Sequence, residues 1–504
     1  MLKYVMALFV YNTLSRRKEE FRPIDPPHVG MYVCGITPYD ETHLGHARAY
    51  VTFDLIRRYL EYSGYQVKHI QNITDIDDKI IAKSQHPTSN IQTKGNSQIS
   101  DPKLACAAVA ETYTKSFFEV MDRLNVKRAT VYPKATENID GMVRWIGGLV
   151  DKGFAYQLDD GVYFEVDKFA DYGKLSGKKK EEQEPGARVQ VLGKKKNPLD
   201  FVLWKKAKEG EPSWPSPWGE GRPGWHIECS VMSTKYLGEQ FDIHGGGLDL
   251  EFPHHENETA QTEALTGKSP WVKYWLHNGF VNVNKQKMSK SLGNFFTLKD
   301  IFQKYDPMVI RFFILMSHYR SPINYSDAEI DSVKEGWERI RQFVADLDFL
   351  LTHPPTPSLK KRGGEETEDQ VLEIADMAED FITFNDKFKA AMDDDFNSAS
   401  AIAAIYDLIR YCRKTLDEGE AEKECLALMK RTVIELCGVL GLQLETRKPK
   451  AESRTQDIEK LIAEREAARK AKDFPRADEI RKKLAERGIE LEDTPYGTKW
   501  KAQA

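Results

Sequence analysis

The stretch that most constrains the fold is "YVCGITPYDETHLGHARAY", which spans residues 32–50. The residues up to Cys34 read as the end of a short apolar strand, whereas residues 47–62 carry apolar side chains at helical spacing. This order of strand, loop and helix predicts an open parallel α/β sheet. Cys34 then lies at the carboxyl end of a strand and faces the crevice where such sheets bind ligands.

His43 and His46 stand at the expected start of this helix, with Gly45 between them. Unpaired backbone N–H groups and the positive end of the helix dipole favour an anion at that position. We therefore interpret the two histidines as partners of a phosphate rather than of a metal ion. If Cys34 binds a metal, its fellow ligands come from elsewhere in the chain.

Composition narrows the class of protein without identifying a partner. The 504 residues suggest about three domains, and a net charge of −5 gives no bulk indication of nucleic-acid binding. No apolar run approaches the roughly 20 residues of a membrane span, so no membrane association is expected. The six cysteines are few and irregularly spaced, which predicts reduced thiols and a cytoplasmic location. Nothing in the sequence indicates an obligatory protein partner.

Changes of pattern along the chain predict its division into domains. Two polar stretches, at 84–103 and 353–369, are unsuited to building a core. Helical amphipathic stretches begin at 326, and a charge-rich piece that also reads as helical ends the chain. The predicted fold is a Rossmann-like doubly wound α/β domain over 1–325 with an insertion at about 104–215, a helical bundle over 326–448, and a small domain over 449–504.

Two later stretches supply candidate metal ligands to join Cys34. They are "GRPGWHIECS", with Cys229, and "DIHGGGLDLEFPHHENE", with His254 and Glu258. Thiolate, imidazole and carboxylate groups are zinc ligands, and a helix starting at Pro253 places His254 and Glu258 on one face while His255 points elsewhere. Single buried cysteines and histidines are common without a metal. Spacing alone leaves both readings open.

Two further stretches suit a nucleotide. "GFVNVNKQKMSKSLGNFF" presents Lys287 and Lys290 on a turn, where they suit the charge of a polyphosphate, although an exposed basic turn is the simpler reading. "FDIHGGGLD" reads as a strand that ends in a glycine turn. Backbone can approach a nucleotide closely there, and Asp249 can accept a hydrogen bond from a ribose hydroxyl.

Taken together, these motifs resemble a known family. "HLGH" and "KMSKS" are similar to the two signatures of class I aminoacyl-tRNA synthetases, with Leu44 in place of the usual isoleucine. "YVCGITPYD", "NITDIDDKI", "GRPGWHIECS" and "FDIHGGGLDLEFPHHENE" resemble the cysteinyl-tRNA synthetase family, and "ADEIRKKLAERGIELEDTPYGTKW" is similar to its small C-terminal domain.

The resemblance implies an activity and a role for each motif. It implies ATP-dependent activation of L-cysteine to cysteinyl-adenylate, transfer to tRNA(Cys), and selection of cysteine over serine through a zinc–thiolate bond. The implied zinc ligands are Cys34, Cys229, His254 and Glu258. The implied ATP-binding residues are His43, Gly45, His46, Asp249, Lys287 and Lys290, with Mg²⁺ accompanying ATP, and Trp225 and His244 flank the amino acid.

The resemblance also implies that the bundle contacts tRNA and that the tail reads the anticodon. The candidate anticodon residues are Arg469, Asp478, Arg481, Asp493 and Trp500; the simpler alternative is an exposed charged helix. One rival function is a ligase of the same fold that joins cysteine to an amino-sugar thiol precursor, which needs no tRNA-reading tail. A zinc-dependent nucleic-acid-binding module without catalysis leaves HLGH and KMSKS unexplained.

Overall fold

The computed structural model describes residues 7–85, 100–178, 195–284, 286–287, 296–352, 368–418, 423–444, 452–494 and 497–502. Lys290 and the rest of residues 288–295 lie outside this description, as do most of the two polar stretches. Among the described helices, none is long and apolar enough to cross a membrane.

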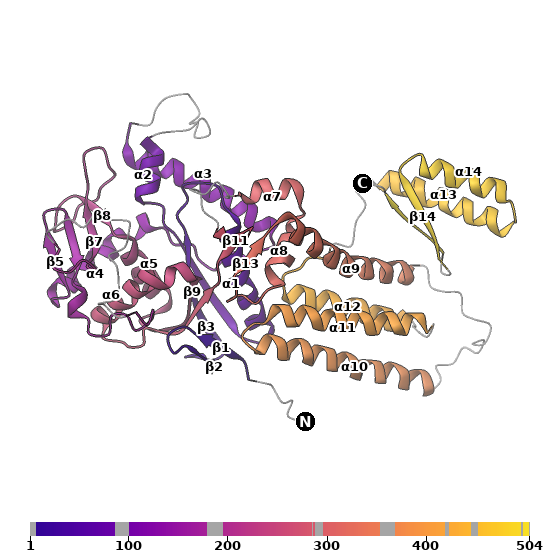
Figure 1. Ribbon diagram of the computed structural model, residues 1–504, viewed down its shortest axis with the longest axis horizontal. Helices are drawn as coiled ribbons and strands as arrows, with labels where there is room; N and C mark the ends of the chain where they lie inside the picture. Colours follow the sequence, from indigo (N-terminus) through magenta and orange to yellow (C-terminus); the bar gives the residue numbers. More distant parts are fainter. Residues whose placement is uncertain are drawn as a thin grey trace. The chain divides into compact units, whose positions relative to one another are not determined.

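A four-stranded parallel sheet forms the centre of the first part of the chain (Figure 1). Its strand order is β10 (Val272–Asn278), β9 (Phe241–Gly247), β3 (His28–Ile36) and β4 (Gln66–Ile73). Burial is almost continuous along β3 and β9, as expected of strands that are covered on both faces. The predicted parallel α/β sheet is confirmed.

Helices cover both faces of this sheet. Gly245 on β9 faces Phe53, because a Cβ atom added at this glycine would lie 2.1 Å from the Phe53 ring. Cys34 on β3 faces the opposite side, since side chains alternate along a strand and Gly245 pairs with the preceding residue, Val33. The helices of this part are α1 (Leu44–Tyr62), α2 (Asp78–Gln85), α3 (Pro102–Arg123), α4 (Ile139–Asp151), α5 (Trp225–Leu237), α6 (Glu256–Thr266), α7 (Leu298–Lys304) and α8 (Pro307–Leu315).

Three small antiparallel or mixed sheets accompany the central one. One is the hairpin of β1 (Phe9–Asn12) and β2 (Arg17–Glu20), and another has the order β5 (Ala155–Leu158), β6 (Gly161–Phe164), β7 (Phe201–Lys206) and β8 (Gly221–Pro223). The last strand of this second sheet lies beyond residue 215, where we expected the insertion to end. The third has the order β12 (Gln286–Lys287), β11 (Val281–Val283) and β13 (Ile323–Tyr325).

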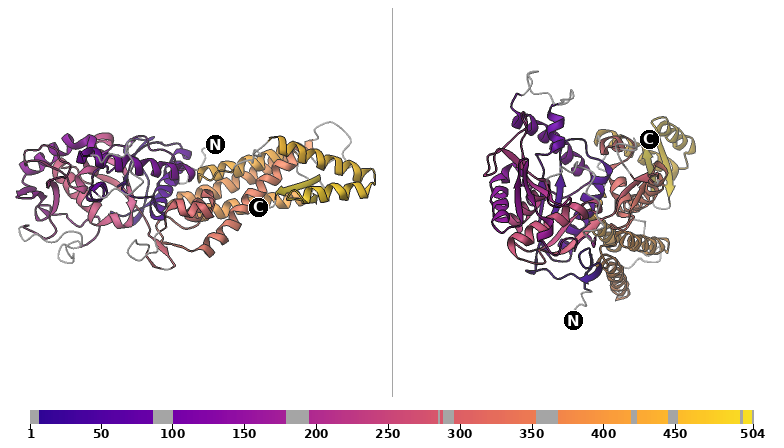
Figure 2. Two further views of the ribbon diagram at one scale, coloured as in Figure 1. Left: turned by 90° about the horizontal axis from the view of Figure 1, so that it is seen from above. Right: turned by 60° about the vertical axis from the view of Figure 1, so that its left-hand side comes forward.

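Four long helices run side by side as a bundle in Figures 1 and 2. They are α9 (Asp327–Thr352), α10 (Glu368–Asp393), α11 (Ser398–Asp417) and α12 (Lys423–Val439). The Tyr411 hydroxyl donates to Asp380 at 2.7 Å between α11 and α10, and Lys430 pairs with Asp348 between α12 and α9. The amphipathic stretch 398–441 thus contains two helices, separated where the sequence carries a glycine and several charges.

The compact unit built on the central sheet is discontinuous in sequence. It comprises Met1–Lys334, Lys389–Ile402 and Val439–Leu442. Arg311 Nε on α8 donates to the Leu440 carbonyl at 2.9 Å, and Asn125 Nδ2 donates to the Gly441 carbonyl at 2.8 Å. The chain therefore returns to this unit immediately after α12.

The tail forms a small fold of its own around six buried aliphatic side chains. It consists of α13 (Glu452–Lys470), α14 (Phe474–Ala485) and the hairpin of β14 (Ile489–Thr494) and β15 (Gly497–Ala502). The buried set is Ile458, Ile462, Ile480, Leu484, Ile489 and Leu491. The prediction that the tail is helical to its end is wrong. Apolar and polar residues alternate in "IELED", which suits a strand that is buried on one face.

Candidate active site

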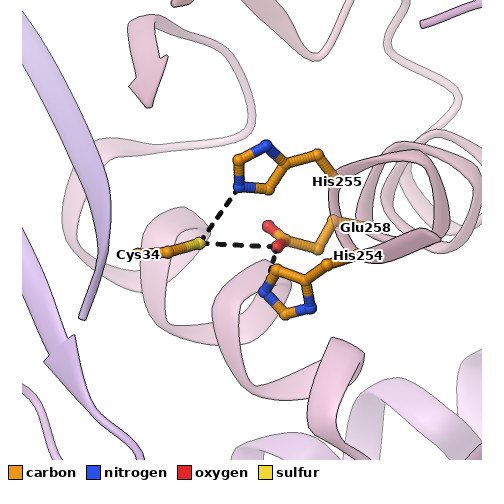
Figure 3. A group of neighbouring side chains, drawn as sticks. All are labelled: Cys34, His254, His255 and Glu258. Carbon is orange, nitrogen blue, oxygen red and sulfur yellow. Dashed lines mark hydrogen bonds and ion pairs between the residues drawn. The ribbon is translucent and has the colours of Figure 1, made fainter. Parts of the chain in front are cut away.

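Four side chains with metal-binding atoms gather where β3 ends and α6 begins (Figure 3). Cys34, His254, His255 and Glu258 are all buried, and their candidate ligand atoms lie within 4.8 Å of one another. Cys34 Sγ is 3.2 Å from His255 Nε2 and 3.8 Å from Glu258 Oε1. Glu258 Oε1 is also 2.8 Å from His254 Nε2. Thiol, imidazole and carboxylate groups are the donors that zinc takes in proteins, so these residues fit such an ion.

Cys229, on α5, completes the set that the resemblance implies. Its Sγ lies 3.9 Å from Cys34 Sγ, so the structure brings the four implied ligands together. It also adds His255, which the sequence analysis wrongly placed on another face. The chain is kinked over Glu251–His255, where Phe252 has extended angles (φ −138°, ψ 133°). His255 and Glu258 are three residues apart, a spacing that places both on one face of a helix.

The charges in this cluster depend on one another. Burial lowers the pKa of His254, but the Glu258 carboxylate and Cys229 together outweigh burial and raise it to about 10. Burial likewise raises the pKa of Glu258, yet His254 and His244 together bring it down to about 2. Protonated His254 thus supplies positive charge among thiol and carboxylate groups, as a bound cation does.

A second layer of histidines orients the cluster. His226 Nδ1 lies 2.9 Å from His254 Nδ1, and because burial lowers the pKa of His226 to about 3, its neutral ring accepts this hydrogen bond. His255 Nδ1 lies 2.8 Å from His277 Nε2. Partners of this kind fix the ring orientation and tautomer of metal-binding histidines. The sequence analysis missed both His226 and His277, which occur singly and without a spacing that marks them.

The two residues predicted to flank the amino acid both touch the cluster. The Trp225 ring stacks on His254, with centroids 4.1 Å apart and an angle of 21° between the rings. His244 is fully buried, and its Nε2 lies 2.8 Å from Glu258 Oε2. Trp225 therefore covers one side of the cluster, whereas His244 supports the carboxylate from within the protein.

The HLGH histidines form the cap of α1. His43 Nδ1 accepts from the Gly45 N–H at 3.1 Å, and His46 Nδ1 accepts from the His43 N–H at 3.4 Å. The two rings stack with centroids 3.7 Å apart. A ring nitrogen that accepts a hydrogen bond carries no proton, so the proton of each neutral ring lies on Nε2. Two imidazole N–H groups therefore stand at the positive end of the helix dipole, an arrangement suited to an anion.

The chain on both sides of the second signature is anchored in the same unit. The first residue of the signature, Lys287, ends β12 and pairs with Asn282 of β11. After it, Thr297 forms a β-bridge with His43, and the Leu298 N–H donates to the Thr42 carbonyl at 2.8 Å. Thr297, six residues after the end of the signature, thus pairs with the first histidine of HLGH.

The three glycines before Asp249 lie within the central sheet rather than in a turn after it. They belong to β9 itself, and Cβ atoms added at Gly245 and Gly246 would lie 2.1 Å from Phe53 and 2.8 Å from Leu250. Close packing of protein side chains accounts for these two positions without a nucleotide. Asp249 is exposed just beyond the carboxyl end of β9, where its Oδ1 lies over Gly247.

The candidate anticodon residues divide into two groups. Asp493 accepts two hydrogen bonds at 2.7 Å from Arg465, a residue that the sequence analysis missed, and lies 3.1 Å from Arg469. Trp500 packs against the tail core. Asp478 and Arg481 are exposed on α14. Asp493 is therefore held by two arginines of the tail while it remains exposed, as are Asp478 and Arg481.

Comparisons with known proteins cover the same three parts of the chain. Residues 20–335 match the class I (C) tRNA synthetase catalytic domain, 387–445 the DALR domain, and 453–500 the cysteinyl-tRNA ligase anticodon binding domain. The chain is 48% identical to the cysteine–tRNA ligase of Geobacter metallireducens, over 99% of this chain and 100% of that protein. It is also 48% identical to the enzyme of the same name from Clostridioides difficile, over 98% and 99%.

Solved structures agree on the fold at much lower identity. A leucyl-tRNA synthetase from Agrobacterium radiobacter, in a complex with tRNA, has a TM-score of 0.57 at 13% identity and covers 84% of each chain. The Mycobacterium tuberculosis methionyl-tRNA synthetase has a TM-score of 0.54 at 14% identity, over 82% of this chain and 89% of its own. The fold is that of class I synthetases, and with the near-full-length relatives this shows that the chain belongs to the cysteine–tRNA ligase family.

Proposed function

We propose that the chain activates L-cysteine with ATP to give cysteinyl-adenylate and pyrophosphate, and then transfers the cysteinyl group to the 3′ end of tRNA(Cys). The observation that carries this proposal is the position of the Cys34–Glu258 cluster. It lies at the carboxyl end of β3, the strand that leads directly into the HLGH loop. A thiol-selective cluster and an anion-binding helix start therefore share one crevice of the sheet.

Zinc is the proposed ion, with Cys34, Cys229, His254 and Glu258 as its ligands. When bound, it supplies a soft Lewis-acid contact that suits a cysteine thiolate and that a serine hydroxyl matches poorly. His226 holds the His254 ring, and His244 holds the Glu258 carboxylate, so the protein fixes both ligands before substrate arrives. A site that requires one particular ligand atom discriminates better than an apolar pocket, for which a methylene is worth about 1–3 kcal/mol.

The proposed reaction is in-line attack of the cysteine carboxylate on the α-phosphate of ATP. The Nε2–H groups of His43 and His46 donate to phosphate oxygens, and Lys287 and Lys290 balance the charge of the leaving pyrophosphate together with Mg²⁺. Gly45 contributes backbone at the helix start, and Asp249 accepts from the ribose. No covalent intermediate with the enzyme is needed, so catalysis consists of positioning and charge stabilisation.

Recognition of tRNA is assigned to the two C-terminal parts. The bundle, proposed to span 326–448, contacts the body of the tRNA, and the tail, proposed to span 449–504, reads the anticodon. Exposed Arg481 and Asp478 are its candidate base contacts, together with Arg469 and the edge of Trp500. A cytoplasmic location is proposed because the six cysteines are few and irregularly spaced, as expected of reduced thiols.

The test is cysteine-dependent charging of a transcript with the anticodon GCA, paired with ATP–pyrophosphate exchange. Exchange with cysteine but not with serine, followed by charging, is the expected result. Exchange without charging of any tRNA would favour the ligase that uses an amino-sugar thiol precursor. Absence of cysteine-dependent exchange in zinc-loaded protein would refute both functions.

A further inference from the structure

We propose that Arg48 is a positioning residue that holds the hairpin bearing the KMSKS signature in register with the HLGH helix. The inference rests on the proposed function of these two motifs and adds a residue that neither signature contains. Arg48 follows His46 by two positions on α1 and is 1% exposed. Its side chain leaves the phosphate site and enters the core between α1 and the end of α8.

Arg48 donates to four backbone carbonyls, one in the last turn of α8 and three in the segment that follows it. Its Nη1 donates to Ile314 at 2.7 Å, and its Nη2 lies 2.7 Å from the carbonyl oxygen of His318 and 3.0 Å from those of Tyr319 and Ser321. The last carbonyls of a helix have no partner within the helix, so a charged donor stabilises them. Burial lowers the pKa of Arg48 to about 10, so the guanidinium stays charged at neutral pH.

The Tyr319 carbonyl links Arg48 to the hairpin. The same oxygen accepts from the Gly279 N–H at 2.9 Å, and Gly279 begins the chain that enters β11. A Cβ atom at Gly279 would lie 2.5 Å from the Ser321 carbonyl oxygen and 2.6 Å from that of Arg320, so this close approach requires glycine. Two backbones therefore meet at the point that Arg48 fixes.

From this point the connection reaches the signature through strand pairing. β13 runs parallel to β11, with Val281 opposite Ile323, and the Ile323 N–H donates to the Phe280 carbonyl at 3.0 Å. β11 pairs in turn with β12, which ends at Lys287. One side chain on the HLGH helix thus sets the position of the strands that lead to Lys287, the first residue of the signature. Charge stabilisation depends on such placement, since an error of about 1 Å can reduce a rate about 10²-fold.

Arg311 provides a matched control. It is equally buried, lies on α8 and also bonds to backbone carbonyls, those of Leu440 at 2.9 Å and Leu124 at 2.8 Å, as well as to Asp54 of α1. Its described contacts do not include the segment from His318 to Tyr325. Loss of Arg311 therefore removes a buried arginine between the same two helices without disturbing the junction with Gly279.

The experiment compares R48M, R48K, G279A and R311M in the full-length zinc-loaded protein. The measurements are the melting temperature, the zinc content, and kcat and KM for ATP and for cysteine in pyrophosphate exchange. We expect R48M and G279A to lower kcat/KM for ATP by about 10²-fold, with unchanged zinc content and unchanged KM for cysteine. R48K should recover part of the loss, and R311M should lower the melting temperature while leaving the ATP parameters near those of the parent.

G279A tests the junction from its other side if R48M does not fold. The inference would be overturned if G279A kept the kcat and KM for ATP of the parent. It would also be overturned if R48M and R311M lost kcat/KM equally for ATP and for cysteine, because Arg48 would then have only a structural role. In either case the parent enzyme would still exchange pyrophosphate, so the proposed function would stand. A parent without cysteine-dependent exchange would refute the proposed function and the inference together.

Discussion

Cys229 and His255 are rivals for one position in the metal cluster, because each lies within 4 Å of Cys34 Sγ. Zinc in proteins takes about four ligands, whereas Cys34, His254 and Glu258 leave two candidates for the remaining place. The hydrogen bond from His255 to His277 suits either a ligand or a supporting ring. Metal content of single variants separates these roles.

We expect the purified protein to carry one zinc ion, and C229A and H254A to lose it. Removing one of four ligands opens the coordination shell and leaves the others poorly compensated. H255Q should keep its zinc, because in the proposed set His255 lies outside the ligands. The measurement is zinc per chain by atomic emission, with D249N as a control that leaves the cluster intact. Full zinc occupancy in C229A together with loss of zinc in H255Q would identify His255, rather than Cys229, as the fourth ligand.

The ion pair of Asp493 and Arg465 makes the stability of the tail depend on pH. The hydrogen bonds from Arg465 hold the pKa of Asp493 below its usual range, and the unfolded value is about 3.9. A carboxyl group with a lowered pKa stabilises the fold fully above the unfolded value, and this contribution is lost as pH falls toward the folded one. Between pH 7 and 5 the pair should therefore contribute constantly.

D493N should raise the equilibrium constant for opening of the tail at pH 7 by about tenfold, since a hydrogen bond between charged groups contributes roughly 1.5 kcal/mol. Below about pH 4 the difference between the parent and the variant should shrink as pH falls, because Asp493 takes up a proton when the tail opens. Hydrogen exchange of amides in residues 452–502 of the full-length chain measures both effects, and R476A, which removes an exposed ion pair, is the control. A constant difference down to pH 2 would contradict this account.

At the scale of elements, one side chain at the start of α1, that of His43, serves two functions. His43 accepts the Gly45 N–H as the helix cap and is proposed to donate from Nε2 to ATP. Asparagine is a favoured cap residue but lacks the imidazole, so it separates the two functions. Alanine removes both.

We expect H43N to keep the parental melting temperature within about 2 °C, because the cap is retained, and to lose adenylation. H46A and K290A should slow single-turnover adenylation by about 10²–10³-fold, by analogy with the loss of one donor to developing charge. Zinc content should not change in any of them. Adenylation rates within a few-fold of the parent would remove these residues from the phosphate site.

Elements governed by local pattern could be predicted from the sequence, and those governed by tertiary packing could not. The strand before Cys34, the helix after His46 and the i, i+4 pair of His254 and Glu258 follow from spacing alone, and the structure contains them. The prediction that His255 points elsewhere overlooked the i, i+3 spacing of His255 and Glu258, which places them on one helix face as the i, i+4 pair is. The packing of Phe53 against Gly245 joins residues that are far apart in the sequence, so no local pattern shows it.

At the scale of the whole molecule, truncation separates activation from tRNA recognition. A chain ending after Leu442 retains Leu440 and Gly441, which accept hydrogen bonds from Arg311 and Asn125 in the sheet unit. It should therefore still exchange pyrophosphate with cysteine, since every proposed zinc and phosphate residue precedes position 292. Charging efficiency on tRNA(Cys) should fall by about 10²-fold, because distant contacts position the reacting end of a substrate.

The control for this truncation is R481A in the full-length chain, which changes one exposed side chain of the tail. It should charge wild-type transcript less well and discriminate less against transcripts with altered anticodons, while exchange stays parental. Equal charging by truncated and full-length proteins would remove the tail from tRNA recognition and return the sugar-ligase function to contention.

The return of the chain to the sheet unit at Val439–Leu442 also governs how the protein can mature during synthesis. Arg311 is made 129 residues before Leu440, the carbonyl that accepts its Nε–H. At about 5–20 residues per second, a ribosome needs roughly 6–26 s to cover this interval. During that time both signatures already exist, but the unit that holds them still lacks its last segment. A nascent chain therefore acquires the last segment of this unit only after the whole bundle has been translated.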